Sequence, residues 1–330
     1  MFESSRPLRL TLYVFFILAG AVLAATLAIR HAERQALVED AARANQQLGL
    51  YATSLHTLIE RYRALPAVLA LDPELRSALK GPLSPEQQDA LNRKLEQING
   101  AAQSSTLELL DHTGLAIAAS NWRLPSSYVG HNYSFRPYFS QTRTQGTGRF
   151  YAVGVTSGIP GYFLSSAVTD DDGRFLGAMV VKLEFPELER EWRQGSDTLL
   201  VSDARGIIFI ANQPGWRYRL LQPLSDSDHA ELKATRQYDK QPLTPLKFES
   251  LHRFDDNSDL ARVEGPEGNA DYLWESLPLT AEGWTLHLLR RPQVAFEDIR
   301  NAALAAAGSW LALVFLLVVR GIDRERQGRR

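Results

Sequence analysis

Residues 107–118 read LELLDHTGLAIA, and this stretch decides the fold class. An apolar run, a turn signal at Asp111–Gly114 and a second apolar run are typical of a β-hairpin. The pattern returns at residues 199–210, which read LLVSDARGIIFI, with Asp203 in the place of Asp111. This repeat predicts a tandem pair of similar α+β units, each built on an antiparallel sheet.

A further pair of strands is predicted at residues 162–168 and 174–183, on either side of the sequence Asp170-Asp171-Asp172-Gly173. Three adjacent carboxylates could ligate Ca²⁺, which prefers oxygen ligands. A tight turn that ends in Asp-Gly between two strands explains the same residues without a metal. We therefore predict a turn here and no metal site.

Before the first hairpin, apolar residues recur at alternating steps of four and three, which predicts one long helix with a heptad seam. This helix should end before Pro66, because a proline disfavours helical geometry in the residue that precedes it. A shorter helix is predicted over residues 85–99. The long helix either forms a dimer and carries a signal or packs on its own domain, and the sequence leaves both open. The seam consists of Leu37, Ala41, Ala44, Leu48, Tyr51, Leu55, Leu58, Tyr62 and Leu65.

Residues 10–29 and 302–319 contain no charged residue and are long enough to cross a bilayer as helices. The first run is longer than the apolar core of a typical signal peptide, and the second contains a stretch that is apolar on all sides. We therefore predict two membrane spans rather than a cleaved signal and a buried helix. An arginine cluster after the second run marks the cytoplasmic side. It predicts a two-pass inner-membrane protein with residues 1–9 and 320–330 in the cytoplasm and residues 30–301 outside. The cluster consists of Arg320, Arg324, Arg326, Arg329 and Arg330.

The chain contains 36 Lys and Arg residues and 38 Asp and Glu residues, which give a net charge of −2. This balance excludes a strongly basic nucleic-acid-binding protein. The absence of Cys excludes disulfide scaffolds, Cys-ligated metal sites and thiol catalysis. The sequence also lacks the Gly-x-Ser-x-Gly, His-Glu-x-x-His and phosphate-loop motifs. We therefore predict no catalytic residues and no cofactor in this chain.

Two segments and one strand of the first unit together supply two cations, aromatic rings and hydroxyl groups. Residues 130–139 read GHNYSFRPYF, residues 155–162 read VTSGIPGY, and Lys182 interrupts a later apolar strand. Arg136 offers a planar fork that can hold one carboxylate, and Lys182 offers a point charge for a second. Hydroxyl groups and an aromatic wall would complete a pocket for a small anion. The candidate site residues are Arg136, Lys182, Tyr133, Thr156 and Ser157.

Two structural roles remain open for the same cations. Lys182 shares a strand face with Glu184, and the two side chains could form an ordinary solvated ion pair. Arg136 could instead donate its hydrogen bonds to backbone carbonyl groups of a loop.

An ordered set of motifs along residues 10–320 resembles the sensor portion of the C4-dicarboxylate-sensing histidine kinases. The block YSFRPYF at residues 133–139 is shared by many extracytoplasmic sensor domains of the double Cache type, and the complete set is more specific. The motifs are the membrane-anchored long helix, RYRALP at 61–66, LDP at 71–73, LDxxG at 110–114, ASNW at 119–122, YSFRPYF, GIPGYF at 158–163 and the strand that carries Lys182.

This resemblance implies an α+β fold in which tandem Cache (PAS-like) domains follow the long helix of residues 30–66, between two transmembrane helices. It implies a membrane-distal domain at 67–195, which binds succinate, fumarate or malate, and a membrane-proximal domain at 196–295. The resemblance also implies that Arg136 and Lys182 bind the two carboxylates, and that the pocket is completed by Tyr133, Thr156, Ser157 and Tyr162.

The resemblance also implies a homodimer and a C-terminal kinase, which would use ATP and Mg²⁺ and would act on a response regulator. The chain ends ten residues after Arg320, so kinase activity is not expected from these 330 residues alone. These residues would either be part of a longer kinase or form a receptor that signals through a separate output protein.

Two other functions remain open. A chemoreceptor or cyclase sensor could bind another small ligand, such as an amino acid. An amino acid would need an acidic partner for its ammonium group near Arg136, and the pocket motifs lack one, although Asp170–Asp172 could lie close in space. The second alternative is a membrane-anchored extracytoplasmic enzyme or scaffold.

Overall fold

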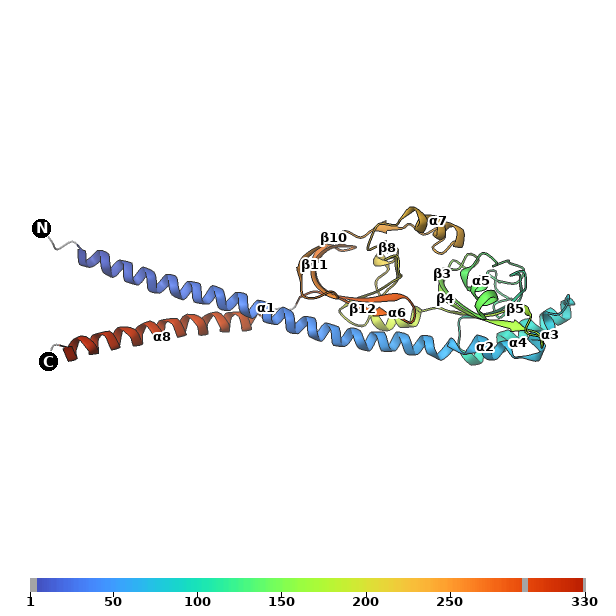
Figure 1. The fold of residues 1–330 in the computed structure, drawn as a ribbon, viewed down its shortest axis with the longest axis horizontal. Helices are drawn as coiled ribbons and strands as arrows, with labels where there is room; N and C mark the ends of the chain where they lie inside the picture. The colour runs from blue at the N-terminus through green and yellow to red at the C-terminus, as the bar shows by residue number, and fades with distance from the viewer. Residues whose placement is uncertain (1–4, 293–295, 329–330) are drawn as a thin grey trace.

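A computed structural model describes residues 5–292 and 296–328. One long helix, α1 (Ser5–Arg63), runs beside two β-sheets that follow each other along its length (Figure 1). The last helix, α8 (Phe296–Gly328), returns beside the first part of α1, so that both chain ends lie at the same end of the molecule. Arg329 and Arg330 of the predicted arginine cluster lie outside the described residues.

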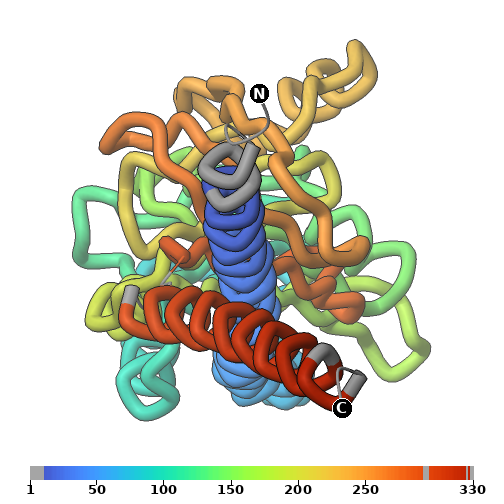
Figure 2. The backbone as a smooth tube through the Cα atoms, turned by 90° about the vertical axis from the view of Figure 1, so that its left-hand side faces the viewer, coloured from blue at the N-terminus to red at the C-terminus, as the bar shows by residue number. Residues whose placement is uncertain are grey.

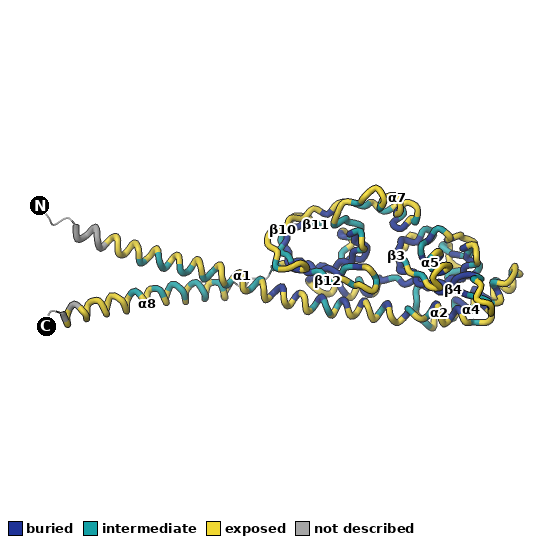
Figure 3. Tube along the Cα trace, viewed as in Figure 1, coloured by how far each residue is buried: buried dark blue, intermediate teal, exposed yellow. Residues whose placement is uncertain are grey.

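The two terminal helices are long and apolar enough to cross a membrane, and their most apolar windows contain only exposed and half-buried residues (Figure 3). The helices cross each other at an angle when viewed along α1 (Figure 2). At their contact the indole of Trp310 donates a hydrogen bond to the carbonyl of Ile17, at 3.0 Å. Gly20 makes this approach possible, because a Cβ atom at that position would overlap the indole ring.

Beyond the membrane-length segment, α1 packs on its own chain. The seam residues Ala44, Leu48 and Leu55 are completely buried in one hydrophobic core with residues of both sheets. The helix ends at Arg63, and Pro66 lies in the first turn of the next helix, α2 (Leu65–Ala70), as the position of the proline predicted. The helices α3 (Pro73–Ala78) and α4 (Pro85–Ala102) follow.

The first sheet has five antiparallel strands in the order β2-β1-β5-β4-β3. The predicted hairpin forms β1 and β2, and the Asp-rich turn joins β4 to β5. Helix α5 (Pro137–Gln145) covers one face of the sheet, and α2 and α4 cover the other. The strands are β1 (Thr106–Asp111), β2 (Ala116–Ala119), β3 (Thr147–Val153), β4 (Pro160–Thr169) and β5 (Phe175–Leu183).

The second sheet has six antiparallel strands in the order β10-β11-β12-β13-β6-β7, and the second predicted hairpin forms β6 and β7. The long helix, the antiparallel sheets and the apolar terminal helices confirm the predicted α+β architecture. The helices and strands between residues 186 and 290, which include these six strands, are α6 (Pro186–Trp192), β6 (Thr198–Ser202), β7 (Ile208–Ala211), the 3-10 helix η1 (Pro214–Trp216), β8 (Arg219–Leu220), α7 (Asp226–Thr235), β9 (Thr244–Pro245), β10 (Phe248–Arg253), β11 (Ser258–Gly265), β12 (Gly268–Leu279) and β13 (Trp284–Arg290).

The segment after α7 joins the second unit to the first. The backbone N–H of Val153, at the end of β3, donates to the carbonyl of Gln237 at 2.8 Å. The Gln237 side chain donates in return to the carbonyl of Tyr151 at 3.0 Å. Because β3 is the edge strand of the first sheet, this segment covers part of an edge that would otherwise lack a partner.

Candidate ligand-binding site

A small closed cavity lies between the first sheet and the segments that precede α5. Its volume is about 10 Å³, which is room for roughly one water molecule. A four-carbon diacid is much larger, so this arrangement is a closed form that must open before such a ligand can enter. The residues that define its chemistry are Glu108, Tyr133, Arg136, Tyr138, Thr156 and Phe163.

Strand register explains why these side chains converge. Phe163 on β4 stands opposite Lys182 on β5, and Lys182 stands opposite Thr106 on β1. Residues paired across strands point to the same face, and Glu108 is two residues after Thr106, so it shares that face. Gly114 lets the loop before α5 lie close to the β1–β2 turn, because its φ is +86° and a Cβ there would overlap the backbone of Ser134.

Lys182 is 1% exposed and has three partners. Its Nζ donates to Glu184 Oε1 at 2.6 Å, to the carbonyl of Ile159 at 3.0 Å and to Ser157 Oγ at 3.5 Å. The predicted pair with Glu184 therefore exists, but the ammonium group is buried rather than solvated. A buried ammonium needs such partners because desolvation of a charge is costly.

Arg136 is also 1% exposed, and its guanidinium group binds backbone carbonyls. Nη1 donates to the carbonyls of Thr235 and Arg236, at 3.0 and 3.1 Å, and Nη2 donates to the carbonyl of Val153 at 2.6 Å. This is the second role that the sequence left open for Arg136. The carbonyls come from both units, so Arg136 ties the wall of the cavity to the end of α7.

The predicted hydroxyl groups form two hydrogen-bonded pairs, and one of these includes Ser157, the partner of Lys182. The hydroxyls of Tyr133 and Thr156 share a hydrogen bond of 2.8 Å, and Tyr128 and Ser157 share one of 3.2 Å. Burial raises the pKa of Tyr133 well above its ordinary value, so this phenol stays protonated. The cavity wall therefore presents neutral hydroxyl groups at neutral pH.

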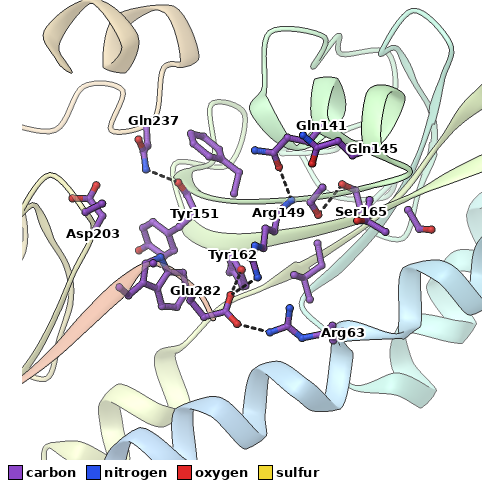
Figure 4. Close-up of a pocket in the computed structure, with 18 of the residues that line it drawn as sticks. Arg63, Gln141, Gln145, Arg149, Tyr151, Tyr162, Ser165, Asp203, Gln237 and Glu282 are labelled. Atoms are coloured by element: carbon purple, nitrogen blue, oxygen red, sulfur yellow. Dashed lines mark hydrogen bonds and ion pairs between the residues drawn. The ribbon is translucent and has the colours of Figure 1, made fainter. Parts of the chain in front are cut away.

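Tyr162 does not belong to this group. Side chains alternate along a strand, and because Phe163 faces the cavity, Tyr162 points to the opposite face of the sheet. There its hydroxyl donates to Glu282, which lies in the turn between β12 and β13 and is also paired with Arg63 of α1 (Figure 4). These residues line a wider cleft of about 700 Å³ between the two units. The expectation that Tyr162 completes the ligand pocket therefore does not match this geometry.

Glu108 is a residue of the cavity that the sequence reasoning missed. Tyr138 donates to Glu108 Oε1 at 3.3 Å, and Oε2 is buried with no hydrogen-bond partner among the described residues. Burial raises the pKa of Glu108 to about 7, although the Tyr138 hydrogen bond and the charges of Lys182 and Arg136 act in the opposite direction. The available signal was a charged residue within an apolar strand, which is the same signal that singled out Lys182.

The expectation that the site lacks an acidic group near Arg136 is therefore corrected by Glu108. The three Asp residues that were considered for this role belong to the β4–β5 turn instead. Asp171 pairs with Arg76 on α3, at 2.9 Å, and Asp172 pairs with Arg174 within the turn, at 2.8 Å.

Known proteins similar to this chain are sensors. It is 35% identical over 314 residues to the C4-dicarboxylate transport sensor protein DctB of Rhizobium meliloti, a match that covers 93% of this chain and 50% of that protein. It is 30% identical over 293 residues to the DctB protein of Pseudomonas aeruginosa, with coverage of 89% and 45%. The chain thus spans about half the length of the curated relatives it matches.

A solved structure agrees with these relatives. The sensor domain of the V. cholerae histidine kinase DctB superposes with a TM-score of 0.69 and 28% identity, and the match covers 77% of this chain and 98% of that domain. No protein-family model matches the chain.

Proposed function

We propose that this chain, which is related over nearly its whole length to the C4-dicarboxylate transport sensor proteins, is the sensor region of a transmembrane receptor for C4-dicarboxylates. The chain is a two-pass membrane protein, since its relatives are membrane sensors and its two apolar helices flank the folded region. The region between the spans would lie outside the cytoplasmic membrane, with the arginine-rich end inside.

The observation that carries the proposal is the buried ammonium group of Lys182, which donates to the hydroxyl of Ser157 next to Thr156. Two carboxylate oxygens can be satisfied by such a set of donors. In the closed form the carboxylate of Glu184 takes one position on Lys182, at 2.6 Å. A ligand carboxylate would replace it there when the segment of residues 154–161 moves outward.

Signalling would follow from the contacts of Arg136. A second ligand carboxylate would compete with the carbonyls of Thr235 and Arg236 for its guanidinium group, because those carbonyls now use its Nη1. Occupancy of the cavity would then change the junction with α7 and, through the second sheet, the position of α1. A ligand shifts such an equilibrium only by its differential affinity, and a change from 1:99 to 99:1 needs about 5.5 kcal/mol.

The output would be a histidine kinase that acts on a response regulator. Since the chain spans about half of its curated relatives, the kinase, its use of ATP and Mg²⁺ and its response regulator remain part of the proposal. A homodimer built along α1 is likewise proposed, and its contacts would use the part of the seam that faces away from the sheets.

The test is calorimetric titration of the purified full chain in detergent micelles with succinate, fumarate and L-malate. Lys182→Met should weaken binding by about 2–5 kcal/mol, because it removes one partner of a buried charge pairing. Lys94→Met is the matched control, since Lys94 on α4 pairs with Asp72 and Glu74 far from the cavity. Wild-type affinity in Lys182→Met, or the absence of C4-dicarboxylate binding by the wild type, would refute the proposal. Arg136 is a less suitable target because its loss would also loosen the junction between the units.

An amino-acid ligand is the second candidate, and Glu108 is the observation that favours it. A buried carboxyl group beside Arg136 and Lys182 is the partner that an ammonium group would need. Binding of neutral amino acids, such as L-alanine, without binding of any diacid in the same titration would favour this alternative.

A further inference from the structure

We infer that Glu108 makes the cavity selective for a C4-dicarboxylate that carries a hydrogen-bond donor on C2, either a hydroxyl or an ammonium group, over the unsubstituted diacid. This inference rests on the proposed function and assigns its specificity to one residue. It follows from the position of Glu108, from its incomplete hydrogen bonding and from the charges around it.

Glu108 is placed to contact a ligand in this cavity. It lines the same cavity as Arg136 and Thr156, and its strand β1 stands next to β5, which carries Lys182. Its side chain is fixed in place by Tyr138, whose hydroxyl donates to Oε1. A ligand held between Lys182 and Arg136 would therefore lie against Glu108 Oε2.

The free oxygen of Glu108 is a buried acceptor without a donor. Oε2 has no hydrogen-bond partner among the described residues, although polar atoms this deeply buried normally have one. The hydroxyls of Tyr133 and Thr156, which face the same cavity, bond to each other and make no hydrogen bond to Oε2. A donor on the ligand would satisfy this oxygen, and an unsubstituted methylene group would leave it unpaired.

The charges in and beside the cavity lead to the same conclusion. Arg136 and Lys182 are balanced by Glu108 and Glu184 when both carboxyl groups are ionised. An unsubstituted dianion would then place its negative charge next to Glu108, where like charges in a site of low dielectric repel strongly. A hydroxyl or ammonium group on C2 adds a charge-assisted hydrogen bond to Glu108 that offsets this repulsion. An ammonium group would also reduce the net negative charge of the ligand.

Calorimetric titrations of the full chain in detergent micelles with succinate, L-malate and L-aspartate test this inference. They should be performed at pH 8, where Glu108 is ionised because its pKa is about 7. The wild type should bind L-malate or L-aspartate about 10- to 100-fold more tightly than succinate, the range expected for a hydrogen bond to a charged group. The better of the two ligands distinguishes a hydroxyl donor from an ammonium donor.

The variant Glu108→Gln should reduce this preference to less than about threefold, because an amide lacks the negative charge and can donate a hydrogen bond to a carboxylate. Glu275→Gln is the matched control, because Glu275 is equally buried in a strand of the second sheet and pairs with Ser258. This control should keep the wild-type preference.

The possible outcomes separate the two proposals. Succinate binding to the wild type as tightly as both other ligands would overturn the role of Glu108 and leave the C4-dicarboxylate receptor standing. An unchanged preference in a folded Glu108→Gln variant would do the same. If that variant does not fold, the wild-type ranking decides alone. Failure of all three ligands to bind would overturn the proposed function together with this inference.

Discussion

Replacing Glu108 by Gln should flatten the dependence of stability on pH between pH 5 and pH 8. Burial raises the Glu108 pKa from the ordinary value of 4.5 to about 7 in the folded protein. The folded state therefore holds a proton that the unfolded state releases, and stability falls as pH rises through this window. The contribution of Glu108 is fully present below pH 4.5, falls as pH rises toward about 7 and is lost above that value. At about 1.4 kcal/mol per pH unit, roughly 2–3 kcal/mol is lost between pH 5 and pH 8.

Urea unfolding of the full chain in detergent micelles, followed by tryptophan fluorescence, measures this loss at both pH values. Other titrating groups contribute equally to wild type and variant, among them His287, whose pKa burial lowers to about 4. The difference between the two proteins in their pH 5 to pH 8 change therefore isolates Glu108. A variant that loses as much stability as the wild type over this window would refute the placement of an ionisable Glu108 in a dry cavity.

Two further predictions concern contacts between the parts of the molecule. Glu282→Gln removes the carboxylate that Arg63 and Tyr162 share at the junction between the units. It should lower the free energy of unfolding by about 2 kcal/mol in the same assay. An unchanged free energy of unfolding would contradict the contribution of this shared carboxylate. Gly20→Leu should push Trp310 away from α1 and increase the distance between the two apolar helices. Spin labels on introduced Cys residues would measure that distance, since the chain has no Cys of its own, and an unchanged distance would contradict the packing at Gly20.

The elements that the sequence predicted correctly are those set by local signals. The turn at Asp111–Gly114, the helix break before Pro66 and the two apolar helices each depend on residues that are adjacent in sequence. Ser157 does lie beside Lys182, although it belongs to the turn between β3 and β4 rather than to a strand. Tyr162 could have been excluded by the alternation of side chains along a strand, since its neighbour Phe163 faces the cavity.

The remaining features depend on contacts between distant segments. The guanidinium group of Arg136 is bound by the carbonyls of Thr235 and Arg236, and no local pattern shows that α7 returns to the first unit. The position of Glu108 in the cavity could not be predicted from the sequence for a related reason. Its apolar neighbours identify a buried strand, but only the assembled sheet shows which of its faces borders the cavity.

The segment around Gln237 has a practical consequence for dissecting this protein. By pairing with the end of β3, it shields a strand edge that would otherwise recruit strands from other molecules. A truncated chain that stops after β5 would expose that edge and should form soluble oligomers or aggregates. Isolating the first unit in monomeric form would therefore require either keeping residues 226–241 attached or placing a charged residue on the outer side of β3.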